Sequence, residues 1–233
     1  MTWRFGHHII PAPSGPDRVV SIALPAVMPA KPLVVLCTDG QALPAFSTGL
    51  SSARPDLHPV LIGVHSDPQS RAQDYLFDGG VHYQAHEDFF VDVLPVWLYA
   101  EYGLSLERSR TVAFGFSNGG AFVLTMGLRH PDSFSAIFSF SSPKLPTRPC
   151  VSRHQFPMPA IYLATGCIGP EKKIRQNVLQ LARWLRSRDI PVTVSEKQAG
   201  HTLDFWAAEF PAALDWFHSH TNAPTEKSQS GNP

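Results

Sequence analysis

Cysteine is scarce in this sequence, and so are other features that would define a class of protein. The 233 residues include three cysteines, Cys37, Cys150 and Cys167, without a C-x-x-C pair. This odd number and spacing indicate neither a disulfide framework nor a zinc site, so we expect no metal ion. The N-terminal stretch lacks the apolar segment of a signal peptide, and no apolar run is long enough to span a membrane. We therefore expect a cytoplasmic protein that does not bind membranes.

An excess of charge of either sign is also missing. Lysine plus arginine and aspartate plus glutamate number 19 each. Because a basic excess is what attracts nucleic acid or anionic lipid, neither is an expected partner. The composition is that of a globular protein, with 43% hydrophobic and 16% charged residues. A chain of this length fits one large domain or two small ones, and no break in composition divides it. We expect one domain over residues 1–220 and a disordered polar tail over 221–233.

Short apolar runs alternate with helix-like segments along most of the chain. Continuous apolar runs that end in turns are typical of strands buried on both faces of a sheet. Such strands are expected at residues 31–40, 58–67, 110–116, 133–142, 159–166 and 191–198, with edge strands and loops in the proline-rich residues 1–30. Helices are expected at residues 87–103, 118–131, 171–189 and 203–220, with a kink at Pro95. This alternation predicts an α/β fold, with a mostly parallel central sheet and helices on both faces.

One serine stands among glycines where an expected strand meets an expected helix. The stretch reads Gly115-Phe116-Ser117-Asn118-Gly119, a G-x-S-x-G pattern. A tight turn at this junction strains its central residue, projects that side chain above the sheet and requires small neighbours. The helix N-terminus adds free N–H groups and a positive dipole end, which suit developing negative charge. The pattern predicts that Ser117 is a nucleophile; a Gly/Ser loop that only joins two elements is the alternative.

A serine nucleophile needs a base to take its proton, and an acid to orient that base. In this architecture the base follows the last strand, where the sequence has His201. The acid should follow the preceding strand, and Glu171 is the only carboxylate in residues 166–171. The order Ser117, Glu171, His201 is the acyl-transfer order of this architecture. Glu171 also lies where the start of a helix favours an acid, so an orienting role and a helix-start role both fit.

An oxyanion hole completes the chemistry that these residues predict. One donor should be the backbone N–H of Asn118, the residue after the nucleophile. The second should come from the turn Asp39-Gly40-Gln41 after an early buried strand, because Gly40 allows the Gln41 N–H to approach the serine. An ordinary Asp-Gly turn is the alternative for this segment.

Several stretches together resemble the "Putative esterase" family of α/β-hydrolases, the esterase D and enterochelin-esterase-like group. The resemblance spans roughly residues 30–218 and rests on VVLCTDGQ, SRAQDY, FFVDVLPVWLYAEYG, AFGFSNGGAFVLTMGLRHPDSF and AGHTLDFW. It implies a single-domain α/β-hydrolase that acts on a small-molecule ester without a cofactor. In such proteins the oxyanion hole maps to Gln41 and Asn118. The resemblance also places Arg71 and Tyr75 in a loop near the pocket, as substrate-binding residues or as a pair that braces the loop.

The acid loop departs from the pattern of this family. Relatives commonly carry the acid where this chain has Gly169, and Glu171 lies further along, behind Pro170. A distorted triad and a Ser-His dyad therefore both remain open. Three functions follow: a serine esterase that works through an acyl-enzyme, an acyltransferase that uses the same nucleophile, and a catalytically silent binding protein with this fold. The serine esterase is the leading hypothesis. The intact serine, histidine and turn glycines argue against the silent binding protein, whereas the irregular acid loop argues for it.

Overall fold

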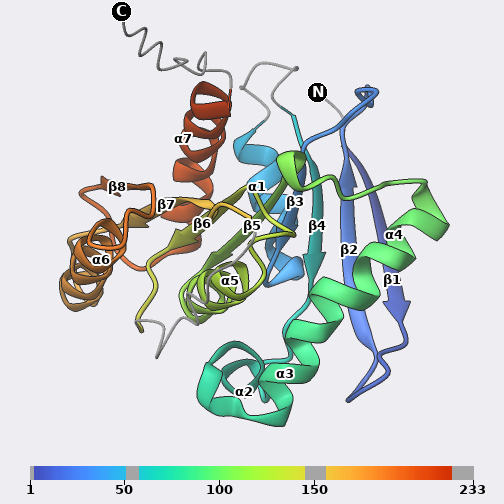
Figure 1. The fold of residues 1–233 in the computed structure, drawn as a ribbon, viewed down its shortest axis with the longest axis horizontal. Coiled ribbons are helices and arrows are strands. Elements are labelled where there is room, and N and C mark those ends of the chain that lie inside the picture. The colour runs from blue at the N-terminus through green and yellow to red at the C-terminus, as the bar shows by residue number, and fades with distance from the viewer. Residues whose placement is uncertain (1–2, 51–57, 145–155, 222–233) are drawn as a thin grey trace, which may run out of the picture.

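A single sheet of eight strands forms the centre of the molecule (Figure 1). The computed structural model describes residues 3–50, 58–144 and 156–221. Of the tail expected to be disordered over residues 221–233, Thr221 ends helix α7 (Leu203–Thr221), and the rest lies outside the described residues. The strand order is β1-β2-β4-β3-β5-β6-β7-β8. The strands are β1 (Arg4–Ile10), β2 (Arg18–Leu24), β3 (Val34–Cys37), β4 (Val60–Val64), β5 (Thr111–Phe116), β6 (Ala136–Phe140), β7 (Ala160–Thr165) and β8 (Val192–Glu196).

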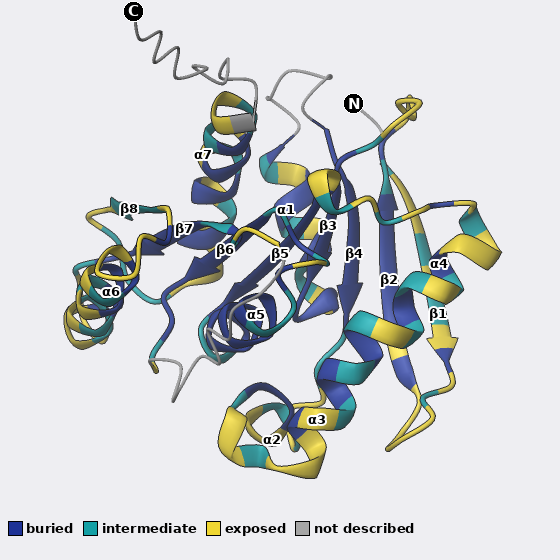
Figure 2. Cartoon of the chain, in the orientation of Figure 1, coloured by how far each residue is buried: buried dark blue, intermediate teal, exposed yellow. Residues whose placement is uncertain are grey.

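The sheet is parallel from β4 to β8 and antiparallel only at one edge. Strands β1 and β2 pair antiparallel, as do β2 and β4, and all the other neighbours pair parallel. Every residue of β3, β4, β5 and β6 is buried, which explains their continuous apolar sequences (Figure 2). The predicted mostly parallel sheet is confirmed. The carboxyl ends of its parallel strands all lie at the same end of the sheet, and the candidate residues come directly after these strand ends.

Helices cover both faces of the sheet. The α-helices are α1 (Leu43–Gly49), α2 (Arg71–Tyr75), α3 (Val81–Asp88), α4 (Leu94–Tyr102), α5 (Asn118–Arg129), α6 (Glu171–Arg186) and α7 (Leu203–Thr221). Shorter helical segments are η1 (Gly40–Ala42), η3 (Phe77–Gly79), η4 (Phe89–Val93) and η5 (Arg108–Arg110). Buried residues of α2 to α6 and η4 belong to one apolar cluster, and those of α1 and α7 belong to a second. The sheet separates these two clusters, so both faces of its central strands are buried.

The helix expected over residues 87–103 is longer and less regular than its sequence indicates. Helices α3 and α4 are joined by η4, a π-helical stretch in which the Leu94 N–H donates to the carbonyl of Phe89. Pro95 follows directly, and a proline inside a helix has no N–H for the carbonyl four residues before it. The irregularity predicted for Pro95 therefore takes the form of a widened turn just before the proline.

Two short helices were not expected from the sequence. Helix α1 follows the turn after β3, and α2 contains Arg71 and Tyr75, which the family resemblance placed in a loop. The loop expectation for these two residues is wrong. Segments of five to seven residues are too short to show helical periodicity, so tertiary packing rather than sequence pattern decides their conformation.

Candidate active site

The turn between β5 and α5 is tight and carries Ser117. The backbone of Ser117 has φ 54° and ψ −129°, a strained conformation typical of the nucleophile turn in this architecture. Its N–H donates to the carbonyl of Phe140 on the neighbouring strand β6 at 2.9 Å. A Cβ added to Gly115 or Gly119 would lie 2.8 or 2.2 Å from Thr38 Oγ1. Both glycines are therefore required, because the turn packs directly against the end of β3.

The side chains of Ser117, His201 and Glu171, which the sequence analysis proposed as a catalytic group, are linked by a chain of hydrogen bonds. Ser117 follows β5, Glu171 follows β7 and His201 follows β8. His201 Nε2 is 3.0 Å from Ser117 Oγ, and His201 Nδ1 is 2.6 Å from Glu171 Oε1. The histidine side chain is 26% exposed and the glutamate side chain is fully buried. The structure thus brings together a hydroxyl, an imidazole and a carboxylate in the order that acyl transfer requires.

The Glu171 carboxylate is hydrogen-bonded on both of its oxygens. Besides the contact of Oε1 with His201, Oε2 accepts hydrogen bonds from the Gly166 N–H at 2.8 Å and the Thr165 hydroxyl at 3.0 Å. Burial raises the pKa of this carboxyl. The hydrogen bonds, led by that from His201 and including one from the Ser141 side chain, lower the pKa more, so it lies below its usual value. The carboxylate is therefore ionised at neutral pH.

The acid reaches His201 although it lies behind Gly169 and Pro170. Gly169 adopts φ 61°, a conformation that favours glycine, and Glu171 is the first residue of α6. A Cβ added to Gly166 would lie 2.2 Å from the carbonyl oxygen of Ala199. The end of β7 therefore packs against the segment that leads to His201. This close packing brings the first residue of α6 within reach of the imidazole, so the departure from the family pattern is accommodated.

The turn after β3 is held by one buried carboxylate, Asp39. This residue adopts φ 52° and ψ 53°. Its side chain accepts hydrogen bonds from Ser66 Oγ at 2.6 Å and from Arg71 Nε and Nη2 at 2.7 and 2.8 Å. Its N–H donates to the Tyr75 hydroxyl at 2.9 Å. These are the contacts of a bracing pair, and Tyr75 has no exposed surface through which to contact a substrate.

Gln41 and Asn118 lie on the two segments that the oxyanion hole would use. Gln41 belongs to η1, directly after β3, and Asn118 is the first residue of α5, directly after Ser117. The Gln41 side chain donates to Ser66 Oγ at 2.9 Å and accepts from the Ser66 N–H at 3.3 Å. Because β3 and β5 are neighbours in the sheet, both turns lie at the same edge. That the backbone N–H groups of Gln41 and Asn118 form an oxyanion hole remains a prediction.

Asp39, Ser141 and Trp206 contact this site, but none of them was predicted from the sequence as a site residue. Asp39 was visible only as part of an Asp-Gly turn, and Trp206 only as part of the AGHTLDFW stretch. Ser141 has φ 50° and follows β6 in a serine-rich segment without a motif. The one available signal was position, since all three residues lie near the carboxyl ends of strands, where chemistry gathers in parallel sheets.

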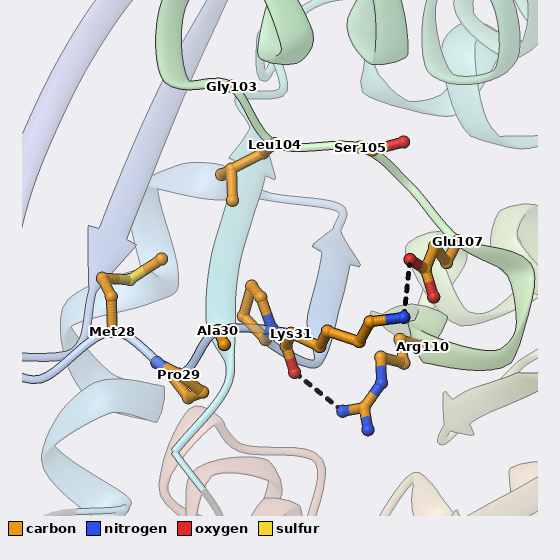
Figure 3. Close-up of a pocket in the computed structure, with 10 residues that line it drawn as sticks. Met28, Pro29, Ala30, Lys31, Gly103, Leu104, Ser105, Glu107 and Arg110 are labelled. Carbon is orange, nitrogen blue, oxygen red and sulfur yellow. Dashed lines mark hydrogen bonds and ion pairs between the residues drawn. The ribbon is translucent and has the colours of Figure 1, made fainter.

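A cavity of about 190 Å³ lies at the opposite end of the sheet (Figure 3). Its lining includes Lys31, which precedes β3, and Arg110, which precedes β5. Lys31 pairs with Glu107 at 3.4 Å, and Arg110 donates to the Lys31 carbonyl at 2.7 Å. These residues mark the amino ends of the strands, whereas Ser117 follows the carboxyl end of β5. The cavity is therefore separate from the candidate active site.

The part of the chain that the structure describes contains neither a candidate metal-binding group nor a candidate membrane-spanning helix. Within residues 3–50, 58–144 and 156–221, no three histidine, cysteine, aspartate or glutamate side chains gather as a group that could hold a metal ion. None of the helices in those ranges is both long enough and apolar enough to cross a membrane.

Together, the fold and the site geometry define an α/β-hydrolase. A mostly parallel sheet, a strained serine between strand and helix, and the chain order serine, acid, histidine are features of this class. A family model described as "Putative esterase" matches residues 14–217. The chain belongs to this family and is a carboxylic ester hydrolase. No curated protein matches the sequence.

Solved structures of other esterases share the fold. S-formylglutathione hydrolase from Staphylococcus aureus is 15% identical with a TM-score of 0.70, and the match covers 93% of this chain and 98% of that one. A ferulic acid esterase is 14% identical with a TM-score of 0.71 and the same coverage of both chains. The enterobactin esterase from Shigella flexneri, solved with 2,3-dihydroxy-N-benzoyl-serine, is 19% identical with a TM-score of 0.74. That match covers 93% of this chain and 60% of the other.

Proposed function

We propose that this protein hydrolyses a small-molecule carboxylic ester through an acyl-enzyme formed on Ser117. The observation that carries the proposal is the unbroken row from Ser117 Oγ to His201 Nε2 at 3.0 Å and from His201 Nδ1 to Glu171 Oε1 at 2.6 Å. Both distances are within hydrogen-bond reach, which is the geometric requirement for an activated serine. The strained backbone at Ser117 supports the same role, because strain of this kind gathers at reactive positions.

In the proposed reaction, Ser117 Oγ attacks the ester carbonyl carbon while its proton passes to His201 Nε2. The tetrahedral intermediate collapses when the C–O bond to the alcohol breaks, and His201 gives the proton to the departing oxygen. Water then attacks the acyl-enzyme with the help of His201, which releases the acid and restores the Ser117 hydroxyl. The two steps together consume one water molecule and need no cofactor.

Glu171 is proposed to orient the base. Its ionised carboxylate faces Nδ1 of His201, so the neutral imidazole carries its proton on Nδ1 and leaves Nε2 free to accept the proton of Ser117. The same carboxylate stabilises the imidazolium that forms during attack. We assign the N–H groups of Gln41 and Asn118 as donors to the oxyanion, with the Asn118 N–H at the positive end of α5.

Arg71 and Tyr75 are proposed to keep the oxyanion turn in place rather than to bind the substrate. Both contact Asp39, the residue before Gly40-Gln41. A Cβ on Gly40 would lie 2.1 Å from the Gly63 carbonyl oxygen, so the turn is also pressed against β4. A turn fixed from both sides can hold a backbone donor without reorganising during the reaction, which is how oxyanion holes achieve their effect.

A fluorophosphonate probe together with p-nitrophenyl esters of varied acyl length tests the proposal. The wild-type protein should be labelled and should release p-nitrophenol, and Ser117→Ala should abolish both while its thermal unfolding stays unchanged. Ser105→Ala, an exposed serine near the amino end of β5, is the matched control and should behave like wild type. Hydrolysis by a folded Ser117→Ala protein would overturn the mechanism.

An acyltransferase would use the same acyl-enzyme but pass it to an alcohol or a thiol. Adding such acceptors and analysing the products separates the two activities, because transfer yields a new ester or thioester where hydrolysis yields the free acid. A silent binding protein would leave the probe unreacted.

A further inference from the structure

The indole of Trp206 touches two members of the candidate active site. Trp206 lies in α7, shortly after His201, and only 6% of the residue is exposed. Its ring is perpendicular to the His201 ring, with centroids 4.8 Å apart. The same indole stacks on Phe116, the residue before the nucleophile, with centroids 4.4 Å apart and planes 22° from parallel. One rigid side chain thus contacts both the base and the strand end that presents the serine.

The indole N–H extends this contact toward the acid. It donates to Ser141 Oγ at 2.9 Å, and the Ser141 side chain is among the groups that lower the pKa of the Glu171 carboxyl. Ser141 is fully buried and adopts φ 50°, a conformation that costs free energy in a residue other than glycine. Its N–H donates to the carbonyl of Ala164 on β7 at 2.7 Å, which fixes the backbone beside the acid loop.

We propose that Trp206 and Ser141 act as a positioning pair that orients Glu171 and His201 for the reaction. This inference rests on the proposed function of these two residues. A hydroxyl has one proton to donate, and its oxygen accepts the indole N–H, so the proton is left to point at the Glu171 carboxylate. The perpendicular indole meanwhile restricts rotation of the imidazole ring. The pair therefore acts on both ends of the Glu171–His201 hydrogen bond.

Packing alone would explain part of this arrangement, because Trp206 also belongs to the apolar cluster under α7. The two roles differ in what they require of the indole. A packing role requires only the ring, which phenylalanine largely supplies. A positioning role requires the N–H as well, because without it the Ser141 hydroxyl is free to rotate away from Glu171.

The test compares Trp206→Phe, Ser141→Gly and their double variant with wild type in ester hydrolysis. Glycine at position 141 removes the hydroxyl and accepts the positive φ without strain. Trp216→Phe is the matched control, because the Trp216 indole lies on the same helix and donates to Thr193 Oγ1 at 3.0 Å. Ten residues of helix place it about 15 Å further along α7.

Each single variant should lower kcat roughly ten- to a hundredfold with little change in KM, because a hydrogen bond that supports a charged group is lost. The double variant should lose little more than either single variant, since both break the same chain of hydrogen bonds. Trp216→Phe should keep the wild-type kcat. Full activity in Trp206→Phe, or additive losses in the double variant, would overturn the proposal.

Proton NMR of the His201 Nδ1–H keeps the inference testable even if the ester activity itself is absent. In wild type and Trp216→Phe this proton should be protected and give a sharp downfield resonance. In Trp206→Phe and Ser141→Gly it should broaden or shift, with the fold intact by circular dichroism. An unchanged resonance in both variants would overturn the positioning role. Absence of probe labelling in wild type would count against the proposed function alone.

Discussion

Glu171→Gln separates the two roles that the position of this residue allows. The substitution conserves size and replaces one carboxylate oxygen by an NH₂ group. The Gly166 N–H and the Thr165 hydroxyl both point at Oε2, so the amide oxygen of glutamine should occupy that place. The NH₂ group would then face His201 Nδ1 and donate to it. His201 would be held with its proton on Nε2, the atom that must accept the proton of Ser117.

The expected loss in kcat is large because the wrong tautomer blocks the first proton transfer. In serine proteases the corresponding change lowers kcat by about 10⁴, and we expect a loss of roughly 10³ to 10⁴ here. The free energy of unfolding at neutral pH should fall only modestly, since two of the hydrogen bonds at this position persist while the stabilising charge is lost. If Glu171 served only to start α6, the substitution would cost about 0.3–1 kcal/mol of folding free energy and would hardly affect the rate.

The assay is kcat for the p-nitrophenyl ester that wild type hydrolyses fastest, together with urea unfolding of each protein. Glu107→Gln is the control, because Glu107 is an exposed glutamate in an ion pair with Lys31 at the opposite end of the sheet. It should leave kcat unchanged. A loss under tenfold in a folded Glu171→Gln protein would refute the orienting role and leave a pair of Ser117 and His201.

Three further predictions follow from contacts around the site. The lowered pKa of Glu171 means that its ionised form stabilises the fold above the unfolded value of about 4.3, and that this stability is lost as pH falls through the folded pKa. The difference in unfolding free energy between wild type and Glu171→Gln should therefore shrink as pH falls from neutral through the unfolded and then the folded pKa; a constant difference in urea unfolding would contradict this. Asp39→Ala should lower the free energy of unfolding, measured in urea, by about 1.5–3 kcal/mol, because it removes hydrogen bonds from Arg71 and Ser66 to a buried charge. A loss under about 0.5 kcal/mol, the size of an ordinary surface substitution, would count against the bracing role. Gly119→Ala should lower both Tm and probe labelling, since the new Cβ would lie 2.2 Å from Thr38 Oγ1, and unchanged labelling would show that the turn can shift without harm.

Much of the site could be predicted from the sequence because the order of strands and helices indicates where catalytic residues stand. Ser117 and His201 stood out because each follows an apolar strand at a position that the α/β architecture uses for catalysis. Glu171 was ambiguous for a physical reason: it is the first residue of α6 and it also contacts His201, so both interpretations of its position describe real features.

The supporting contacts could not be predicted because they depend on proximity in space. Asp39 meets Arg71 and Tyr75 only because α2 packs near the end of β3, and α2 is too short to show a periodic pattern. Ser141 and Trp206 are 65 positions apart, and neither belongs to a motif with the other. Sequence patterns describe elements well, but the meeting of side chains from different loops follows from packing.

The distribution of the site along the chain has a consequence for folding. Ser117 and His201 are separated by 84 positions and Glu171 and His201 by 30, so the hydrogen bonds among these three side chains form only through non-local contacts. Such contacts form late, since the chain entropy lost in closing a loop must be overcome first. During synthesis the histidine emerges after β8, when the nucleophile and the acid have already been made. A growing chain should thus stay inactive until β8 and α7 dock, and recovered esterase activity in a refolding experiment would report this last docking step rather than the formation of the central strands.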